Sequence, residues 1–118
     1  MELRSVYVGV ENMDRALEFY RDLFEMEPTQ MEARFSTFEF ETLAFGLYHA
    51  ESDGLEFEFG NNCVPNLRVD DVDAAYRRIE RLAPEMVHDE ILEFSEYRTF
   101  HFVDTEGNEI EVFGIDSE

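Results

Sequence analysis

The sequence predicts an α+β domain built from two copies of one strand–helix–strand–strand–strand unit. Several segments alternate apolar and polar residues, as strands do, and two segments carry apolar residues at helical spacing. The two halves also resemble each other, since "VGVENMDRALEFY" aligns with "NLRVDDVDAAYRRI" and "FSTFEF" with "YRTFHF". We therefore expect one domain, residues 1–118, with a first module at about 1–60 and a second at about 61–118.

The first module is expected to begin with a short apolar strand, "LRSVYVGV", at residues 3–10. A helix near 12–25 follows, with Asn12 as its cap. Its apolar stripe consists of Met13, Ala16, Leu17, Tyr20 and Leu23. The alternating segments at 34–41 and 43–50 then form a hairpin. Segment 51–62, "ESDGLEFEFGNN", is either an extra strand or an acidic loop that connects the halves.

The second module repeats this order, with an apolar strand at 63–69 and a helix near 71–82 capped by Asp70 or Asp71. The apolar stripe of this helix consists of Val72, Ala75, Ile79 and Leu82. Three further strands are expected within residues 88–96, 97–104 and 109–115. Neither module can cover both faces of its sheet. We therefore expect the helices to cover one face of each sheet and the opposite faces to curve around a shared hollow.

Composition excludes several classes of protein. The content of 44% apolar residues, with 12 phenylalanines, argues against disorder. No apolar run approaches the roughly 18–20 residues that a bilayer span needs, and the acidic start does not resemble a secretory leader, so we expect a cytoplasmic protein. The lone cysteine, Cys63, excludes an intrachain disulfide and is expected to be a buried structural thiol.

The charge is strongly acidic, with 29 acids against nine basic residues, all of them arginine, and a formal net charge of −20. At about 1 M salt the Debye length is only about 3 Å, so the resulting repulsion would be screened. We therefore expect a halophilic organism. Nucleic acid and anionic membranes are disfavoured as partners, because both need basic patches.

Three stretches carry a resemblance to a known family. "SVYVGVENMDRALEFYRDLFEME" resembles the opening of a glyoxalase/bleomycin-resistance/extradiol-dioxygenase module, "NLRVDDVDAAYRRI" the opening of the second module, and "FHFVDTEGNEIEVF" the closing hairpin. The chain is thus identified as a member of the vicinal oxygen chelate superfamily, and the charge suggests a haloarchaeal one. The resemblance implies paired βαβββ modules around a U-shaped cleft, a homodimer, and a scaffold shared by isomerases, dioxygenases and drug-binding proteins.

The resemblance also implies four positions at which family metalloenzymes hold a divalent metal. In this chain they fall on Ser5, Val64, Glu111 and either Ala44 or Gly46. Only Glu111 offers a good ligand, because serine binds such ions poorly and the others have no donor. Glu58 becomes a second ligand if the gap lies elsewhere, and His49, His88 and His101 match no ligand position. We therefore expect no family metal centre.

Strand alternation then predicts which side chains face the hollow. The aromatic residues are Tyr7, Phe35, Tyr48, Tyr97 and Phe113, and the polar ones are Glu39, Arg68, His101 and Glu111. Arg68 and Glu111 either anchor a ligand or neutralise one another. His101 beside Glu39 is either a general base with an orienting carboxylate or a structural contact. Glu109, near a strand end, is expected to be solvated.

Three functions remain open. The first is a metal-free protein that binds a small organic molecule through Tyr7, Glu39, Tyr48, Arg68, Tyr97 and Phe113. The second is a divalent-metal-dependent lyase, isomerase or dioxygenase of the same superfamily. The third is a cofactor-free acid–base enzyme that uses Glu111 or His101.

Overall fold

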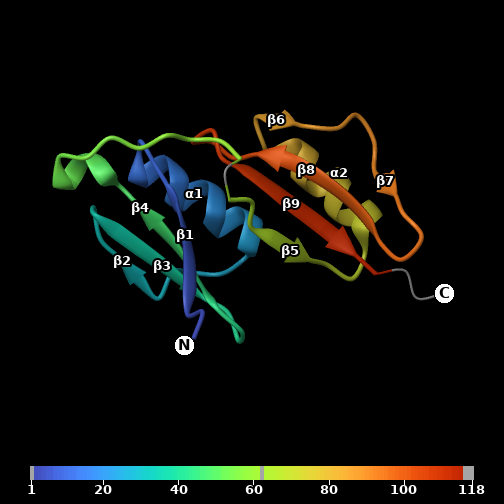
Figure 1. Ribbon diagram of the computed structural model, residues 1–118, viewed down its shortest axis with the longest axis horizontal. Helices are drawn as coiled ribbons and strands as arrows, with labels where there is room; N and C mark the ends of the chain where they lie inside the picture. The colour runs from blue at the N-terminus through green and yellow to red at the C-terminus, as the bar shows by residue number, and fades with distance from the viewer. Residues whose placement is uncertain (1, 62, 116–118) are drawn as a thin grey trace. The chain divides into compact units, whose positions relative to one another are not determined.

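The computed structural model describes residues 2–61 and 63–115. The chain divides into two compact units, residues 1–59 and 60–118, and each contains one β-sheet and one α-helix (Figure 1). The two helices and the longer strands follow one another as predicted, which confirms the α+β class. No helix in the described part of the chain is both long and apolar enough to cross a membrane.

The first unit is a four-stranded sheet in the order β1-β4-β3-β2. β1 runs parallel to β4, and β3 pairs with β4 as the predicted antiparallel hairpin. The elements are β1 (Ser5–Gly9), α1 (Met13–Phe24), β2 (Gln30–Met31), β3 (Phe35–Glu39), β4 (Ala44–Tyr48) and the 3-10 helix η1 (Ala50–Asp53).

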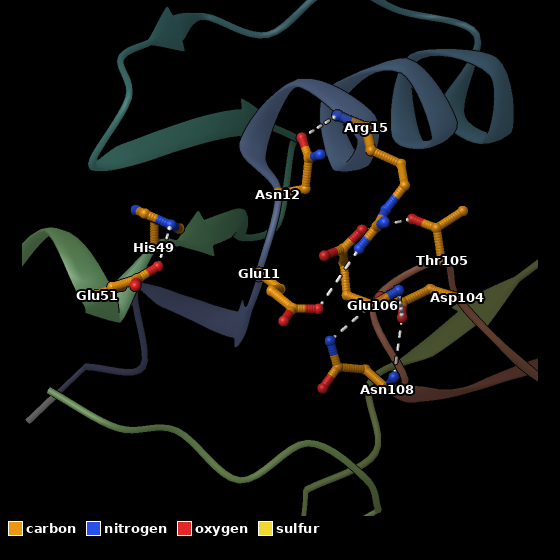
Figure 2. A network of polar contacts seen from close by, with 9 residues as sticks. All are labelled: Glu11, Asn12, Arg15, His49, Glu51, Asp104, Thr105, Glu106 and Asn108. Carbon is orange, nitrogen blue, oxygen red and sulfur yellow. Dashed lines mark hydrogen bonds and ion pairs between the residues drawn. The ribbon is translucent and has the colours of Figure 1, made fainter.

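Helix α1 begins at the predicted cap, because the Asn12 side chain accepts a hydrogen bond from the Arg15 amide (Figure 2). Its C-terminal cap is Glu25, which adopts a left-handed conformation with φ 55°. The whole predicted apolar stripe is buried, together with Phe19. Tyr20 packs against Phe45 of β4, with ring centroids 5.1 Å apart, so the helix covers one face of the sheet.

The second unit is a sheet in the order β5-β9-β8-β6, with β7 also paired to β8. Its elements are β5 (Asn66–Arg68), α2 (Val72–Leu82), β6 (Glu85–Met86), β7 (Leu92–Glu93), β8 (Arg98–Val103) and β9 (Glu109–Gly114). Asp71, not Asp70, caps α2 by accepting a hydrogen bond from the Ala74 amide. The core consists of Val72, Ile79, Phe100, Phe102, Ile110 and Val112.

The turn between β8 and β9 is organised by Asp104, which is only 1% exposed. Its Oδ1 accepts hydrogen bonds from the amides of Glu106 and Asn108, both at 2.8 Å (Figure 2). Gly107 adopts φ 94°, which glycine tolerates without strain. The turn therefore fixes the register in which β8 and β9 present their side chains.

Three local predictions need correction, and one open alternative is decided. Among described residues, segment 51–62 contains the end of η1 and irregular chain but no strand, which agrees with the predicted loop and not with the extra strand. The strand predicted within 88–96 shrinks to Leu92–Glu93, and the two-residue strands β2 and β6 were missed because they are too short to show alternation. Cys63 is exposed instead of buried, since it lies in irregular chain before β5.

Candidate functional site

Strand registers place the predicted inward-facing residues of the first unit on one sheet face. Tyr7 lies opposite Gly46, Phe35 opposite Tyr48, and Ser5 opposite Ala44. Cross-strand partners share a face, and the alternate residues between them face α1. The alternation predicted for these strands is therefore confirmed.

This face carries a pocket of about 510 Å³. It is lined by Tyr7, Arg34, Phe35, Tyr48, Leu55, Glu56 and Phe57. Tyr7 and Tyr48 were predicted to bind a ligand, and Phe35 was predicted to share their face. Arg34, Leu55, Glu56 and Phe57 were missed, although the alternation in "LEFEFG" (55–60) hinted at a one-sided aromatic segment.

Four rings form the walls. Three of the ring pairs meet at steep angles, and Phe35 and Tyr48 are tilted by 42°. The interplanar angles are 73° for Tyr7–Phe35, 81° for Tyr7–Tyr48 and 85° for Tyr48–Phe57. The corresponding centroids lie 5.6, 5.6 and 5.9 Å apart, which is typical of edge-to-face aromatic pairs. We call these four residues, Tyr7, Phe35, Tyr48 and Phe57, the aromatic cup.

Two glycines let the aromatic cup lie directly on the sheet. A Cβ atom on Gly9 would fall 1.9 Å from Cδ2 of Phe57, and one on Gly46 would fall 2.6 Å from Cζ of Phe35. Both contacts are far inside van der Waals distance, so each ring occupies the volume that a side chain would fill. Glycine within a predicted strand was the available sequence signal for such a close approach.

A polar network joins two residues that line the pocket, Arg34 and Tyr48, through Asp53. The Arg34 guanidinium donates from Nε to both carboxylate oxygens of Asp53, each at 2.9 Å. Tyr48 donates its hydroxyl proton to Asp53 Oδ2 at 2.7 Å. Hydrogen bonding from Arg34, and then from Tyr48, lowers the pKa of Asp53, while the bond to Asp53 raises the pKa of Tyr48. Arg34 Cζ also lies 5.6 Å from the Tyr48 ring centroid.

In the second unit, the two predicted catalytic residues are cross-strand partners. His101 on β8 pairs in register with Glu111 on β9, and its Nε2 lies 3.6 Å from Glu111 Oε2. The other ring nitrogen, Nδ1, lies 2.5 Å from Glu109 Oε2. Thr99 donates to Glu111 Oε2 at 2.6 Å. We call these four residues, Thr99, His101, Glu109 and Glu111, the histidine–carboxylate cluster.

Glu109 is more buried than the sequence predicted. Its side chain is only 19% exposed, so it is not the solvated residue that its place near a strand end suggested. The cause is its register, because it lies one alternation from Glu111 on the same face and contacts His101. His101 therefore has two acidic neighbours within its own unit, whereas Glu39 is an exposed residue at the end of β3 in the first unit.

The remaining predicted ligand contacts lie on the second unit. Arg68 and Phe113 are register partners, and Arg68 is exposed while Phe113 is half-buried. Within residues 2–61 and 63–115, no ion pair joins Arg68 to Glu111, which is bound instead by Thr99 and approached by His101. Tyr97 precedes β8 and stacks on Phe94 at 5.0 Å, with an interplanar angle of 21°.

The residues at the family's metal positions do not fit a divalent ion. Ser5 and Ala44 are register neighbours that together offer one exposed hydroxyl, Val64 has no donor, and Glu111 is a single carboxylate. Glu58 is exposed in the irregular segment after η1. In the histidine–carboxylate cluster, the two carboxylates approach opposite ring nitrogens, so the three ligand-type groups do not converge on one point.

The comparisons with known proteins agree with this fold. Residues 3–112 match the model of the Glyoxalase/Bleomycin resistance protein/Dioxygenase superfamily, and the chain belongs to that superfamily. This confirms the family resemblance seen in the sequence. No curated protein matches the chain.

Solved structures show the same fold at low sequence identity. A glyoxalase/bleomycin resistance protein/dioxygenase family enzyme from Burkholderia phytofirmans is 12% identical, with a TM-score of 0.81 over 98% of this chain and 100% of that one. A protein of unknown function from Agrobacterium tumefaciens is 24% identical, with a TM-score of 0.78 over 97% and 94%. A lactoylglutathione lyase from the same species is 21% identical, with a TM-score of 0.73 over 96% and 92%.

Proposed function

We propose that this chain binds a small organic molecule in the aromatic cup and does so without the superfamily's metal centre. The observation that carries the proposal is the pocket of about 510 Å³, whose walls are four aromatic rings seated on a glycine-interrupted sheet face. Pockets for small ligands are commonly of this size, mostly apolar, with a few polar groups that orient the ligand. Arg34 and Glu56 supply those polar groups here.

The pocket's construction supports preorganisation. Phe57 and Phe35 are held against Gly9 and Gly46, and the Tyr48 hydroxyl is held by Asp53. Rings fixed before the ligand arrives lose little further freedom on binding, which favours affinity. We propose direct ligand contacts for Tyr7 and Tyr48; those of Glu39, Arg68, Tyr97 and Phe113 stay predictions.

The alternative is a divalent-metal-dependent lyase, isomerase or dioxygenase of the same superfamily. It needs at least three converging donors, and the four family positions supply one carboxylate and one hydroxyl. The donor set therefore favours the metal-free proposal.

The histidine–carboxylate cluster supports a second candidate function, which is proton transfer to or from a bound molecule. Glu109 at Nδ1 would orient the His101 ring and fix its tautomer, which leaves Nε2 directed toward Glu111. A base with an orienting carboxylate is the arrangement that general acid–base catalysis requires. His101 and Glu111 are the residues that we propose to move the proton.

A fragment screen by ligand-observed NMR in molar KCl tests the binding proposal. We expect hits that compete with one another and that lose affinity in Phe57→Ala and Tyr7→Ala. Phe94→Ala is the control, because it removes an aromatic ring that is as exposed as Tyr7 from the second unit. Hits that bind all variants as they bind the wild type would refute the proposal.

We also propose that the protein is a cytoplasmic homodimer from a halophilic, haloarchaeal source, without nucleic-acid or membrane partners. The net charge of −20 supports the halophilic origin and disfavours polyanionic partners. The homodimer and the compartment rest on the family resemblance and on the composition.

A further inference from the structure

The ring geometry of the aromatic cup limits the shape of the ligand that it can hold. Three of its ring pairs meet at 73–85°, so one flat molecule cannot stack on all four rings at once. A rounded group can instead touch several ring faces. Rounded organic cations gain most from such an enclosure, because every ring face carries partial negative charge.

The aromatic cup already holds one cation, the Arg34 guanidinium, at 5.6 Å from the Tyr48 ring centroid. This charge is matched, since both oxygens of Asp53 lie 2.9 Å from Arg34 Nε. The other charged lining residue is Glu56, and no residue in the described part of the chain forms an ion pair with it. The uncompensated charge at the pocket is therefore negative.

We propose that the ligand of the aromatic cup is an organic cation of the alkylated ammonium class, with its charged head among the rings and near Glu56. This inference rests on the proposed function and deepens it. The cationic head meets Tyr7, Tyr48 and Phe57, and the carboxylate of Glu56 balances its charge.

An anionic ligand is the competing possibility, because both hydrogen bonds from Arg34 to Asp53 use Nε and not the terminal amino groups. An anion placed at those amino groups would lie beside the Asp53 carboxylate and in the pocket that Glu56 lines. Like charges at close range oppose binding, so the charge arrangement favours the cation.

Three compounds of nearly equal shape separate these cases: choline, its neutral isostere 3,3-dimethylbutan-1-ol, and the anion 3,3-dimethylbutanoate. Each is titrated in about 1 M KCl, where the Debye length of about 3 Å suppresses the long-range field of the protein. Binding is followed through the backbone amide NMR signals of Gly9 and Gly46, which lie beneath the rings.

We expect choline to bind about tenfold more tightly than the neutral isostere, as contact with several ring faces implies. Glu56→Gln should weaken choline about two- to fivefold and leave the isostere unchanged. Glu58→Gln is the matched control, since it removes the same charge from the same exposed segment without lining the pocket. Tyr7→Leu should weaken choline more than the isostere.

Equal binding of choline and the alcohol, tighter binding of the butanoate, or equal effects of Glu56→Gln and Glu58→Gln would overturn the cation inference. If the alcohol or the butanoate still shifts the Gly9 and Gly46 amides, the proposed function stands and only the ligand's charge is wrong. If none of the three compounds and no fragment hit shifts those amides, both proposals fail.

Discussion

Substituting Gly9 by alanine tests whether Phe57 is held on the sheet as the structure shows. The new Cβ would lie 1.9 Å from Cδ2 and 2.2 Å from Cε2 of the ring, so Phe57 must leave its place. Gly9 does not have a positive φ, so alanine fits the backbone itself. The cost therefore comes from the ring alone.

The size of this effect follows from burial. Phe57 is 38% exposed, so its displacement forfeits somewhat over half of the roughly 2–3 kcal/mol that full burial of phenylalanine contributes, or about 1.5 kcal/mol. Replacing glycine by alanine returns about 0.4–1 kcal/mol by restricting the unfolded chain. We expect Gly9→Ala to destabilise the protein by about 1 kcal/mol and to abolish ligand binding in the aromatic cup.

A double-mutant cycle supplies the decisive comparison. In a Phe57→Ala background the clash is absent, so Gly9→Ala should be neutral or stabilising by about 0.5 kcal/mol. Urea unfolding of the four proteins in molar KCl would therefore give a coupling energy of about 1.5 kcal/mol. Additive effects, with Gly9→Ala costing the same in both backgrounds, would refute the seating of the ring on the glycine.

Further predictions concern charge, metal and assembly. Arg98 donates to both oxygens of Asp73 and lowers the pKa of that carboxyl group, so this pair should stabilise the fold above the ordinary aspartate pKa of about 3.9 and lose that effect as pH falls through the lowered value. Arg98→Gln should therefore reduce the loss of stability at acidic pH in unfolding measured as a function of pH, and an unchanged loss would contradict the prediction. Elemental analysis should find no bound metal in the wild type or in Glu111→Gln, and the substitution should weaken turnover or ligand binding. If the wild type carries nearly one metal ion per chain and Glu111→Gln loses it, the metalloenzyme alternative is favoured. The melting temperature should rise steeply from about 0.1 M to molar KCl, and a flat profile would remove the halophilic interpretation. Light scattering in high salt should give twice the 13.9 kDa chain mass, and a particle of one chain mass would exclude the homodimer.

Much of the fold was predictable because it depends on neighbouring residues. The caps Asn12 and Asp71 act on amides three residues away, and helical periodicity selects which side chains are buried. Period-two alternation assigned each strand's two faces, and the registers of Tyr7 with Gly46 and of His101 with Glu111 confirm that assignment.

The composition of the aromatic cup was only partly predictable. Tyr7, Phe35 and Tyr48 lie on strands and follow from alternation, but Phe57 belongs to irregular chain whose path no local pattern defines. Arg34 and Asp53 are 19 residues apart, so their pairing depends on where η1 follows β4. The same limit explains Cys63, whose exposure depends on the path of the connecting segment.

The sequence by itself therefore determined the class, the order of the helices and longer strands, the superfamily and the faces of those strands, because caps and periodicity act between residues that are close along the chain. Only the tertiary structure decided that Phe57 lies on Gly9, that Asp53 joins Arg34 to Tyr48, and that Glu109 contacts His101. Those contacts depend on turn geometry and on the paths of irregular segments. The local sequence of such a segment is compatible with many backbone conformations, and tertiary packing selects one of them.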